Sequence, residues 1–362
     1  MRSMRSSRSS RSSINTGAII AILGMCMAPA CGGSGDTPPP SVGDGPDGSS
    51  GPSPEAGARD GASPDDSATP RDGASPVDGG TADPNADGPF TIAEKDANSA
   101  IATTGDNVAI HVAYPNASGP FPVVIFAHGF LLPPAQYTAY LKRLASFGYV
   151  ALTVGFPNGF PNDNPKQAKD LLGGVDWAKA DAVLGPKVDA TRVGMSGHSL
   201  GGKLALLAAT MDPRVKASFV VDPVDSGPNP CTAPGCVVVK DLLPTLSIPT
   251  GFVGETTDTA CAPSADNFTT FYAQAKTPSL KVTATGASHM SFLDDVGTCG
   301  LPCTFCATAT ATNAQVNDMA RALMVAFYER HLRGNVAYDA YLTGADAIAR
   351  YVTTNHATID TK

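Results

Sequence analysis

The sequence predicts an α/β fold built on one doubly wound, mostly parallel β-sheet. Short apolar runs alternate with longer stretches whose apolar residues recur at helical spacing. Parallel strands that are covered on both faces read as continuous apolar runs, and helices connect them. A glycine-rich turn at residues 194–202 joins one such run to a predicted helix. We expect a single folded domain over residues 90–362, preceded by a disordered tether.

Each predicted strand is a short run of apolar residues that ends at a proline, a glycine or a polar turn. Residues 107–114 alternate in polarity and stop at Pro115, which predicts an edge strand. Residues 121–127 form a continuous apolar run, as a central strand buried on both faces should. Further strands are predicted at residues 149–154, 191–195, 216–221, 248–253 and 280–285.

The predicted helices occupy stretches between these strands. Residues 134–147 carry apolar side chains at helical spacing and end before Gly148. Residues 166–184 include the single tryptophan, Trp177, which we assign to the core. Two more helices are predicted, at residues 200–211 directly after the glycine-rich turn and at residues 315–332.

Residues 1–31 are predicted to be an export signal. Four arginines, the last of them Arg11, precede an apolar stretch at residues 17–27 that is short for a bilayer span. Small residues then precede Cys31, as in bacterial lipoprotein signals, which predicts membrane anchoring through a lipid on Cys31. The alternative is plain secretion after cleavage at Ala30. In either case we expect an exported protein, on the outer surface or secreted.

Residues 32–89 are predicted to be a disordered linker, because they consist mainly of Pro, Gly, Ser, Ala and Asp. Between Asp36 and Asp87 there are 11 acidic and 2 basic residues, whereas the whole chain has a net charge of −8. The acidity therefore belongs to the linker. It argues against binding to nucleic acid.

The predicted domain contains six cysteines, and an even number in an exported domain indicates disulfides. Cys231 and Cys236 lie close together across a Pro-Gly turn and form one predicted pair. The pairing of the other four stays open; they are Cys261, Cys299, Cys303 and Cys306. Zinc binding by the last three is the alternative, although no neighbouring histidine completes a ligand set. We expect no metal and no cofactor.

The glycine-rich turn carries a predicted nucleophile. It reads Gly-x-Ser-x-Gly, with Ser199 between Gly197 and Gly201, and it lies between a strand and a helix. Glycine on each side leaves room for the strained backbone of the serine. The following helix directs its free N–H groups toward a developing oxyanion. We therefore predict that Ser199 attacks an acyl group.

A serine nucleophile requires a histidine base and a carboxylate that orients it. His289 follows the last predicted strand in a loop rich in glycine and serine, so we predict it as the base. Two carboxylates are candidates for the acid. Asp222 ends strand 216–221 and has its backbone restricted by Pro223, and we favour it. Asp258 follows the next strand and stays the alternative.

The oxyanion hole is predicted to use two backbone N–H groups. One belongs to Leu200, directly after the nucleophile. The other belongs to Phe130, in the His128-Gly129-Phe130 loop that follows strand 121–127. His128 precedes the nucleophile in the chain, so we assign it to the shape of this loop and not to the base.

Together these motifs resemble the chlorophyllases, a branch of the α/β-hydrolases near the cutinase-like polyester hydrolases. The pieces that carry the resemblance are His-Gly-Phe-Leu-Leu at 128–132, Ser-Phe-Gly-Tyr at 146–149, Gly-His-Ser-Leu-Gly-Gly-Lys at 197–203, Asp-Pro-Val-Asp at 222–225, Cys-Ala-Pro at 261–263 and Ser-His-Met-Ser-Phe-Leu-Asp-Asp at 288–295. The resemblance implies the α/β-hydrolase fold, cleavage of carboxylic esters and Asp222 as the acid. Leu200 departs from plant chlorophyllases, which commonly have Arg there. Residues 248–263 are closer to the cutinase-like pattern, in which Asp258 would be the acid.

The sequence therefore predicts an exported serine esterase of the chlorophyllase-like or lipase-like type. Its expected partner is an ester substrate, which is a small molecule, a lipid or a polymer. Two alternatives stay open: a cutinase-like polyester hydrolase that uses Asp258, and a non-catalytic binding module on the same fold.

Overall fold

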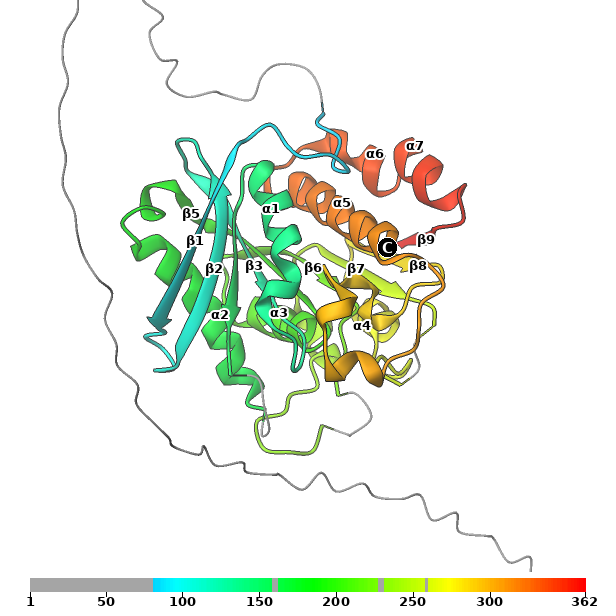
Figure 1. The fold of residues 1–362 in the computed structure, drawn as a ribbon, viewed down its shortest axis with the longest axis horizontal. Coiled ribbons are helices and arrows are strands. Elements are labelled where there is room, and N and C mark those ends of the chain that lie inside the picture. The colour runs from blue at the N-terminus through cyan, green and yellow to red at the C-terminus, as the bar shows by residue number, and fades with distance from the viewer. Residues whose placement is uncertain (1–80, 158–161, 227–230, 258–259) are drawn as a thin grey trace, which may run out of the picture. The chain divides into compact units, whose positions relative to one another are not determined.

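The computed structural model describes residues 81–157, 162–226, 231–257 and 260–362, which belong to one compact unit of the chain (Figure 1). Within these residues nine strands form one sheet. The strands are β1 (Ile92–Ala100), β2 (Asn107–Pro115), β3 (Phe121–Ala127), β4 (Val150–Gly155), β5 (Val188–His198), β6 (Val215–Val221), β7 (Thr250–Glu255), β8 (Ser279–Ala284) and β9 (Ala357–Thr361).

The strand order in the sheet is β1-β2-β4-β3-β5-β6-β7-β8-β9. Neighbouring strands from β4 to β8 in this order pair in parallel, and β1, β2 and β9 pair antiparallel at the two margins. The predicted mostly parallel sheet is therefore confirmed. The central strand β3 is buried along its whole length, as its continuous apolar run predicts.

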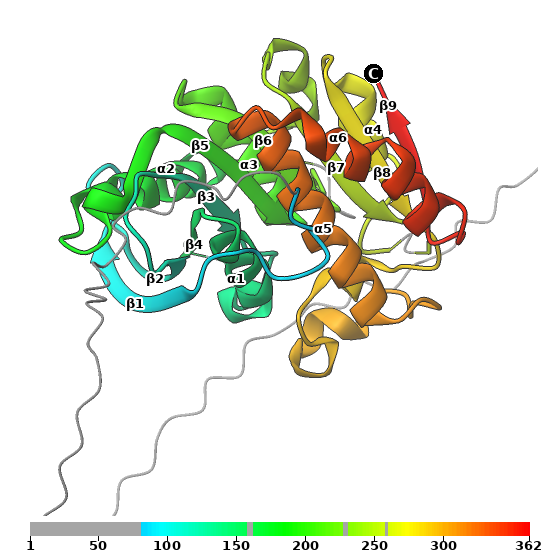
Figure 2. The ribbon, with the colours of Figure 1, turned by 90° about the horizontal axis from the view of Figure 1, so that it is seen from above.

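Helices cover both faces of the sheet (Figure 2). On one face lie α1 (Thr138–Ser146), which follows the 3₁₀ turn η1 (Pro134–Tyr137), and α5 (Asn313–Leu332). On the other face lie α2 (Asn164–Ala180), α3 (Leu200–Met211) and the short α4 (Phe268–Gln274). The chain after α5 forms α6 (Asp339–Leu342), α7 (Ala345–Ala347) and the π-helical turn η8 (Ile348–Val352) before β9.

The margins of the sheet differ from the prediction. The predicted edge strand, β2, pairs with β1 on one side and with β4 on the other, so it is internal. The true edges are β1 and β9, which the sequence did not predict. Their side chains are mostly exposed or half-buried, so neither strand reads as a buried apolar run.

Tyr328 anchors α5 to the centre of the sheet. Its buried hydroxyl donates to the carbonyl of Met195 at 2.9 Å and accepts from the backbone N–H of Phe219 at 3.3 Å. The hydroxyl of Ser196 lies 2.7 Å away. A Cβ atom at Gly194 would lie 2.6 Å from the Tyr328 ring, so only glycine lets α5 approach this closely. These contacts reach β5 three residues before Ser199.

The chain before β1 packs against the domain. Tyr338 donates to the carbonyl of Ala82 at 3.1 Å, Arg350 contacts Asp83 at 2.8 Å, and Gly88 donates to the hydroxyl of Ser146 at 2.9 Å. Packed chain therefore extends before the predicted domain boundary at residue 90. The predicted export signal and most of the predicted linker, residues 1–80, lie outside the described residues.

The six cysteines of the described chain form three disulfides: Cys231–Cys236, Cys261–Cys306 and Cys299–Cys303. The predicted pair is confirmed. The sulfur atoms of the zinc alternative are all engaged in disulfides, so that alternative was wrong.

Trp177 of α2 packs against the core and is half-buried. The ammonium group of Lys95 lies 5.9 Å from its ring centroid and 2.5 Å from the carboxylate of Asp181. This group of side chains links α2 to the edge strand β1.

We predict that Tyr328→Phe lowers the free energy of unfolding by about 1–3 kcal/mol, because it removes one hydroxyl that serves three buried partners. Urea denaturation measures the change. Tyr341→Phe is the matched control, because Tyr341 is only half-buried in α6. Equal stability of Tyr328→Phe and the wild type would contradict the proposed anchor.

Candidate active site

Ser199 lies at a sharp turn between β5 and α3. Its backbone has φ of 56° and ψ of −123°, a left-handed conformation that is strained for a residue with a side chain. A Cβ atom at Gly197 would collide with the backbone of Gly201, and one at Gly201 would collide with the backbone of Ala127. The two motif glycines are therefore required by close packing, as predicted.

The side chains of Ser199, His289 and Asp222 form one hydrogen-bonded series. The hydroxyl oxygen of Ser199 lies 2.9 Å from Nε2 of His289, and Nδ1 of His289 lies 2.6 Å from Oδ2 of Asp222. His289 and Asp222 are buried, whereas Ser199 is partly exposed. The structure thus brings together the three residues that the sequence predicted as nucleophile, base and acid.

Asp222 directly follows β6 and points toward His289. Its backbone φ is 39°, and its N–H donates to the carbonyl of Val253 on β7 at 2.6 Å. This bond and Pro223 hold the carboxylate at the carboxyl end of the sheet. The alternative acid, Asp258, lies outside the described residues.

His289 begins the short 3₁₀ helix η4 (His289–Phe292). Two asparagines of α5 hold the carbonyls of this turn. Asn317 donates to Phe292 at 2.9 Å and to Leu293 at 2.8 Å, and Asn313 donates to Ser291 at 2.8 Å. His289 is therefore carried by a turn that is fixed to the long helix.

Phe130 and Leu200, which supply the predicted oxyanion N–H groups, both lie at this edge of the sheet. Leu200 is the first residue of α3, where N–H groups have no partner within the helix. Phe130 follows β3 in the loop that leads to η1, and Leu131 after it has φ of 56° and exposes half of its side chain. Their role as oxyanion donors stays a prediction.

His128 is a buried residue of the same loop. Its ring stacks on Phe156 with centroids 4.0 Å apart, and its Nδ1 lies 3.0 Å from the carbonyl of Gly129. Burial lowers the pKa of His128 to about 4. The side chain is therefore neutral near pH 7, in a shaping position as predicted.

Two residues of the site were not predicted: His198, which precedes Ser199, and Tyr137 of η1. His198 lies behind His289 with ring centroids 4.6 Å apart. Its Nε2 is 2.9 Å from the carbonyl of His289, and its Nδ1 is 2.9 Å from the hydroxyl of Tyr137. Burial lowers the pKa of His198 well below its usual range.

Lys203 and Asp225 form a buried ion pair beneath the turn. Nζ of Lys203 is 3.3 Å from Oδ1 of Asp225, which also accepts from the N–H of Val239 at 2.9 Å. Nζ lies 3.7 Å from the sulfur of Cys236 as well. The second aspartate of the Asp-Pro-Val-Asp motif therefore ties α3 to a disulfide-closed loop, whereas the first faces His289.

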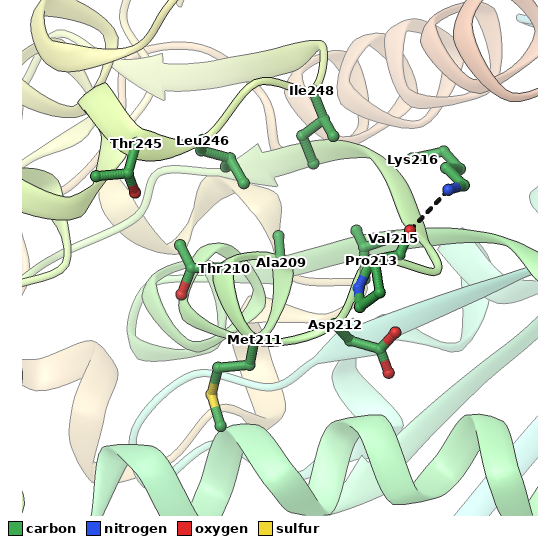
Figure 3. A pocket seen from close by; sticks show the side chains of 10 residues that line it. All are labelled: Ala209, Thr210, Met211, Asp212, Pro213, Val215, Lys216, Thr245, Leu246 and Ile248. Carbon is green, nitrogen blue, oxygen red and sulfur yellow. Dashed lines mark hydrogen bonds between the residues drawn. The ribbon is translucent and has the colours of Figure 1, made fainter.

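A separate open hollow of about 350 Å³ lies at the other end of α3 (Figure 3). It is lined by Ala209, Thr210, Met211, Asp212, Pro213, Val215, Lys216, Thr245, Leu246 and Ile248. Since Ser199 precedes the first residue of α3 and the hollow surrounds its last turn, this hollow is not part of the candidate active site.

In the parts of the chain that the structure covers, no three His, Cys, Asp or Glu side chains are grouped as metal ligands. Over the same residues no helix is long and apolar enough to cross a membrane.

Comparison with known families tests the resemblance that the motifs carry. A protein-family model described as Chlorophyllase matches residues 83–350. The chain belongs to the chlorophyllase family. The match spans both the elbow at Ser199 and the turn that carries His289, and it confirms the predicted branch of the α/β-hydrolases.

Curated relatives of this chlorophyllase-family chain are ester hydrolases. Chlorophyllase-1 of Arabidopsis thaliana is 28% identical over 251 residues, which are 63% of this chain and 77% of the relative. A bis(hydroxyethyl) terephthalate hydrolase of Streptomyces coelicolor is 27% identical over 185 residues, 51% of this chain and 55% of the relative. Cutinase 2 of Thermobifida cellulosilytica is 27% identical over 138 residues, 38% of this chain and 52% of the relative. These matches confirm the predicted enzyme class, a carboxylic ester hydrolase.

We predict that the buried, neutral His128 makes stability depend on pH. The unfolded chain takes up a proton at His128 near pH 6.5, whereas the folded chain does so only near pH 4. The contribution to stability is therefore present above pH 6.5 and is lost as the pH falls toward 4. His128→Phe keeps a ring against Phe156 and should reduce the loss by on the order of 1–3 kcal/mol.

Urea denaturation from pH 4.5 to pH 7.5 measures this difference. His198 and His331 have lowered pKa values, both because of burial, so some pH dependence should persist in the variant. An identical decline in wild type and His128→Phe would contradict the prediction.

Proposed function

We propose that the chain is an exported serine hydrolase that cleaves carboxylic esters through Ser199, His289 and Asp222. The observation that carries the proposal is the unbroken hydrogen-bonded series from Asp222 through His289 to Ser199, placed on a strained elbow. The family and its relatives support the reaction class.

In the first half of the proposed reaction, the hydroxyl oxygen of Ser199 attacks the ester carbonyl carbon. Nε2 of His289 accepts the hydroxyl proton over the 2.9 Å contact. The carbonyl oxygen becomes an oxyanion, which accepts hydrogen bonds from the N–H groups of Phe130 and Leu200. The tetrahedral intermediate collapses when the alcohol leaves with the proton from His289, and an acyl group remains on Ser199.

In the second half, water attacks the acyl carbon while His289 takes one of its protons. The bond to Ser199 breaks, the serine oxygen regains its proton from His289, and the free acid leaves. Throughout both halves Asp222 accepts from Nδ1–H of His289, which fixes the tautomer and stabilises the imidazolium. The residues present supply each proton transfer that the reaction needs.

The side chains beside Ser199 and the names of the relatives indicate the substrate class. The partly exposed Leu131 beside Phe130 supports an ester with an apolar part. The names of two relatives supply two concrete candidates, chlorophyll and bis(hydroxyethyl) terephthalate. We propose an ester of a small molecule, a lipid or a polymer, and p-nitrophenyl esters of increasing acyl length select which candidate to test first.

We predict that Ser199→Ala loses at least about 1,000-fold in kcat on p-nitrophenyl esters with an unchanged fold. Asp222→Asn should lose on the order of 100- to 10,000-fold, because the base then adopts the wrong tautomer. Asp258→Asn is the matched control and should retain activity. A larger loss of kcat in Asp258→Asn than in Asp222→Asn would support the cutinase-like alternative.

The same set of variants tests the non-catalytic alternative. A fluorophosphonate labels only an activated serine, so the wild type should be labelled and Ser199→Ala should not. Wild-type protein that neither hydrolyses any ester nor takes the label would favour a binding module on the same fold.

Export and anchoring form a separate part of the proposal, supported by residues 1–31 of the sequence. We predict that full-length chain expressed in a bacterium sediments with membranes and incorporates labelled palmitate. Cys31→Ser should remove the label and release the protein into the soluble fraction, because a lipid chain supplies the anchor. Secreted wild-type protein without lipid would favour plain cleavage after Ala30.

A further inference from the structure

A buried hydrogen-bonded chain runs behind the candidate active site. The N–H of Gly129 donates to the hydroxyl oxygen of Tyr137 at 3.2 Å. That oxygen lies 2.9 Å from Nδ1 of His198, and Nε2 of His198 lies 2.9 Å from the carbonyl oxygen of His289. The chain therefore begins one residue before Phe130 and ends on the backbone of the base.

The chemistry of the groups gives this chain one direction. A carbonyl oxygen only accepts, so Nε2 of His198 must carry the proton that it donates to His289. Nδ1 of the neutral ring is then the acceptor, and it must receive the hydroxyl proton of Tyr137. The Tyr137 oxygen in turn accepts from the N–H of Gly129. Each hydrogen bond therefore has one donor and one acceptor, which assigns the Nε2–H tautomer to His198.

This hydrogen-bonded series is rigid because its side chains are tightly packed. The exposed fractions of His198 and Tyr137 are both 0%. The Tyr137 ring stacks on Phe126 with centroids 4.8 Å apart, and the His198 ring packs against that of His289. A Cβ atom at Gly129 would meet the Tyr137 hydroxyl at 3.2 Å and Nδ1 of His198 at 3.3 Å, so glycine gives the chain room. Burial also lowers the pKa of His198, which keeps the ring neutral.

We infer that His198 and Tyr137 are positioning residues for ester hydrolysis, because together they fix the base His289 relative to the oxyanion-hole loop. The inference rests on the proposed function. Neither side chain is placed to react with a substrate. Their effect is exerted through the carbonyl of His289 at one end and through Gly129, the neighbour of the proposed oxyanion donor Phe130, at the other.

Tyr137→Phe is the sharpest test, because it removes one oxygen atom and breaks the chain in the middle. The expected result is a loss in kcat on the order of 10- to 100-fold, the effect of small displacements of reacting groups. KM should change by less than about threefold, since substrate contacts remain. Tyr140→Phe is the matched control and should keep wild-type kcat. Tyr140 is equally buried, and its hydroxyl also donates to a carbonyl of η4, Phe292 at 3.0 Å, but it lies outside the chain.

Two results would overturn the inference: wild-type kcat in Tyr137→Phe, or an equal loss in Tyr140→Phe, which would reflect general loosening of η4. Both results are read only where the wild type hydrolyses the ester and Ser199→Ala does not. An inactive wild type, or an active Ser199→Ala, is instead the failure of the proposed function. The two failures are therefore distinguishable.

A second pair of variants and a spectrum test the role of His198 directly. His198→Gln keeps an N–H that can donate to His289 and should retain more kcat than His198→Leu. In the wild type, the ¹⁵N resonances of the six histidines report their tautomers. The two ring-nitrogen resonances that disappear in His198→Gln belong to His198. At pH 7 we expect a protonated Nε2 and a bare Nδ1 on His198. The opposite tautomer would overturn the inference even if Tyr137→Phe fails to fold.

Discussion

The left-handed backbone at Ser199 is the constraint on which the candidate site depends. Such a conformation persists in a residue with a side chain only when its surroundings hold it. Here the N–H of Ser199 donates to Val221 on β6 at 3.1 Å, and its carbonyl accepts from Lys203 at 3.2 Å and from Val224 at 3.3 Å. These bonds tie the turn to the neighbouring strand and to α3. They determine where the hydroxyl points before any catalytic partner is considered.

The topology of the sheet brings the other residues of the candidate site close to Ser199. Parallel strands end at the same edge, so residues that follow β3, β6 and β8 meet around the turn after β5. Asp222 follows β6, His289 lies beyond β8, and Phe130 lies beyond β3. Four segments that are distant in sequence thus reach one place. The asparagines of α5 and the chain through His198 and Tyr137 fix the finer distances between them.

The site was predictable where function leaves a local pattern. Ser199 is marked by its glycines and its strand–turn–helix context, and Asp222 and His289 directly follow predicted strands or their turns. The choice between Asp222 and Asp258 stayed open because both follow strand ends. His198 gave no local signal, since its partners Tyr137 and His289 are 61 and 91 residues away in the chain. Tyr137 falls within residues 134–147, where the apolar spacing predicts a helix, and nothing in that pattern marks its hydroxyl. The edge strands β1 and β9 were not predicted for a different reason. A strand with one neighbour buries few side chains and needs no apolar run.

The position of Trp177 has a consequence for optical work on this enzyme. It is the single tryptophan of the chain, and it lies on α2 beneath Lys95 of the edge strand β1. Intrinsic tryptophan emission is therefore a local reporter of the contact between α2 and β1, on the margin of the sheet. A shift in that emission would register detachment of the edge strand before, or independently of, any disturbance around Ser199. The candidate active site contains no tryptophan, so a tryptophan introduced there would be an unambiguous second reporter.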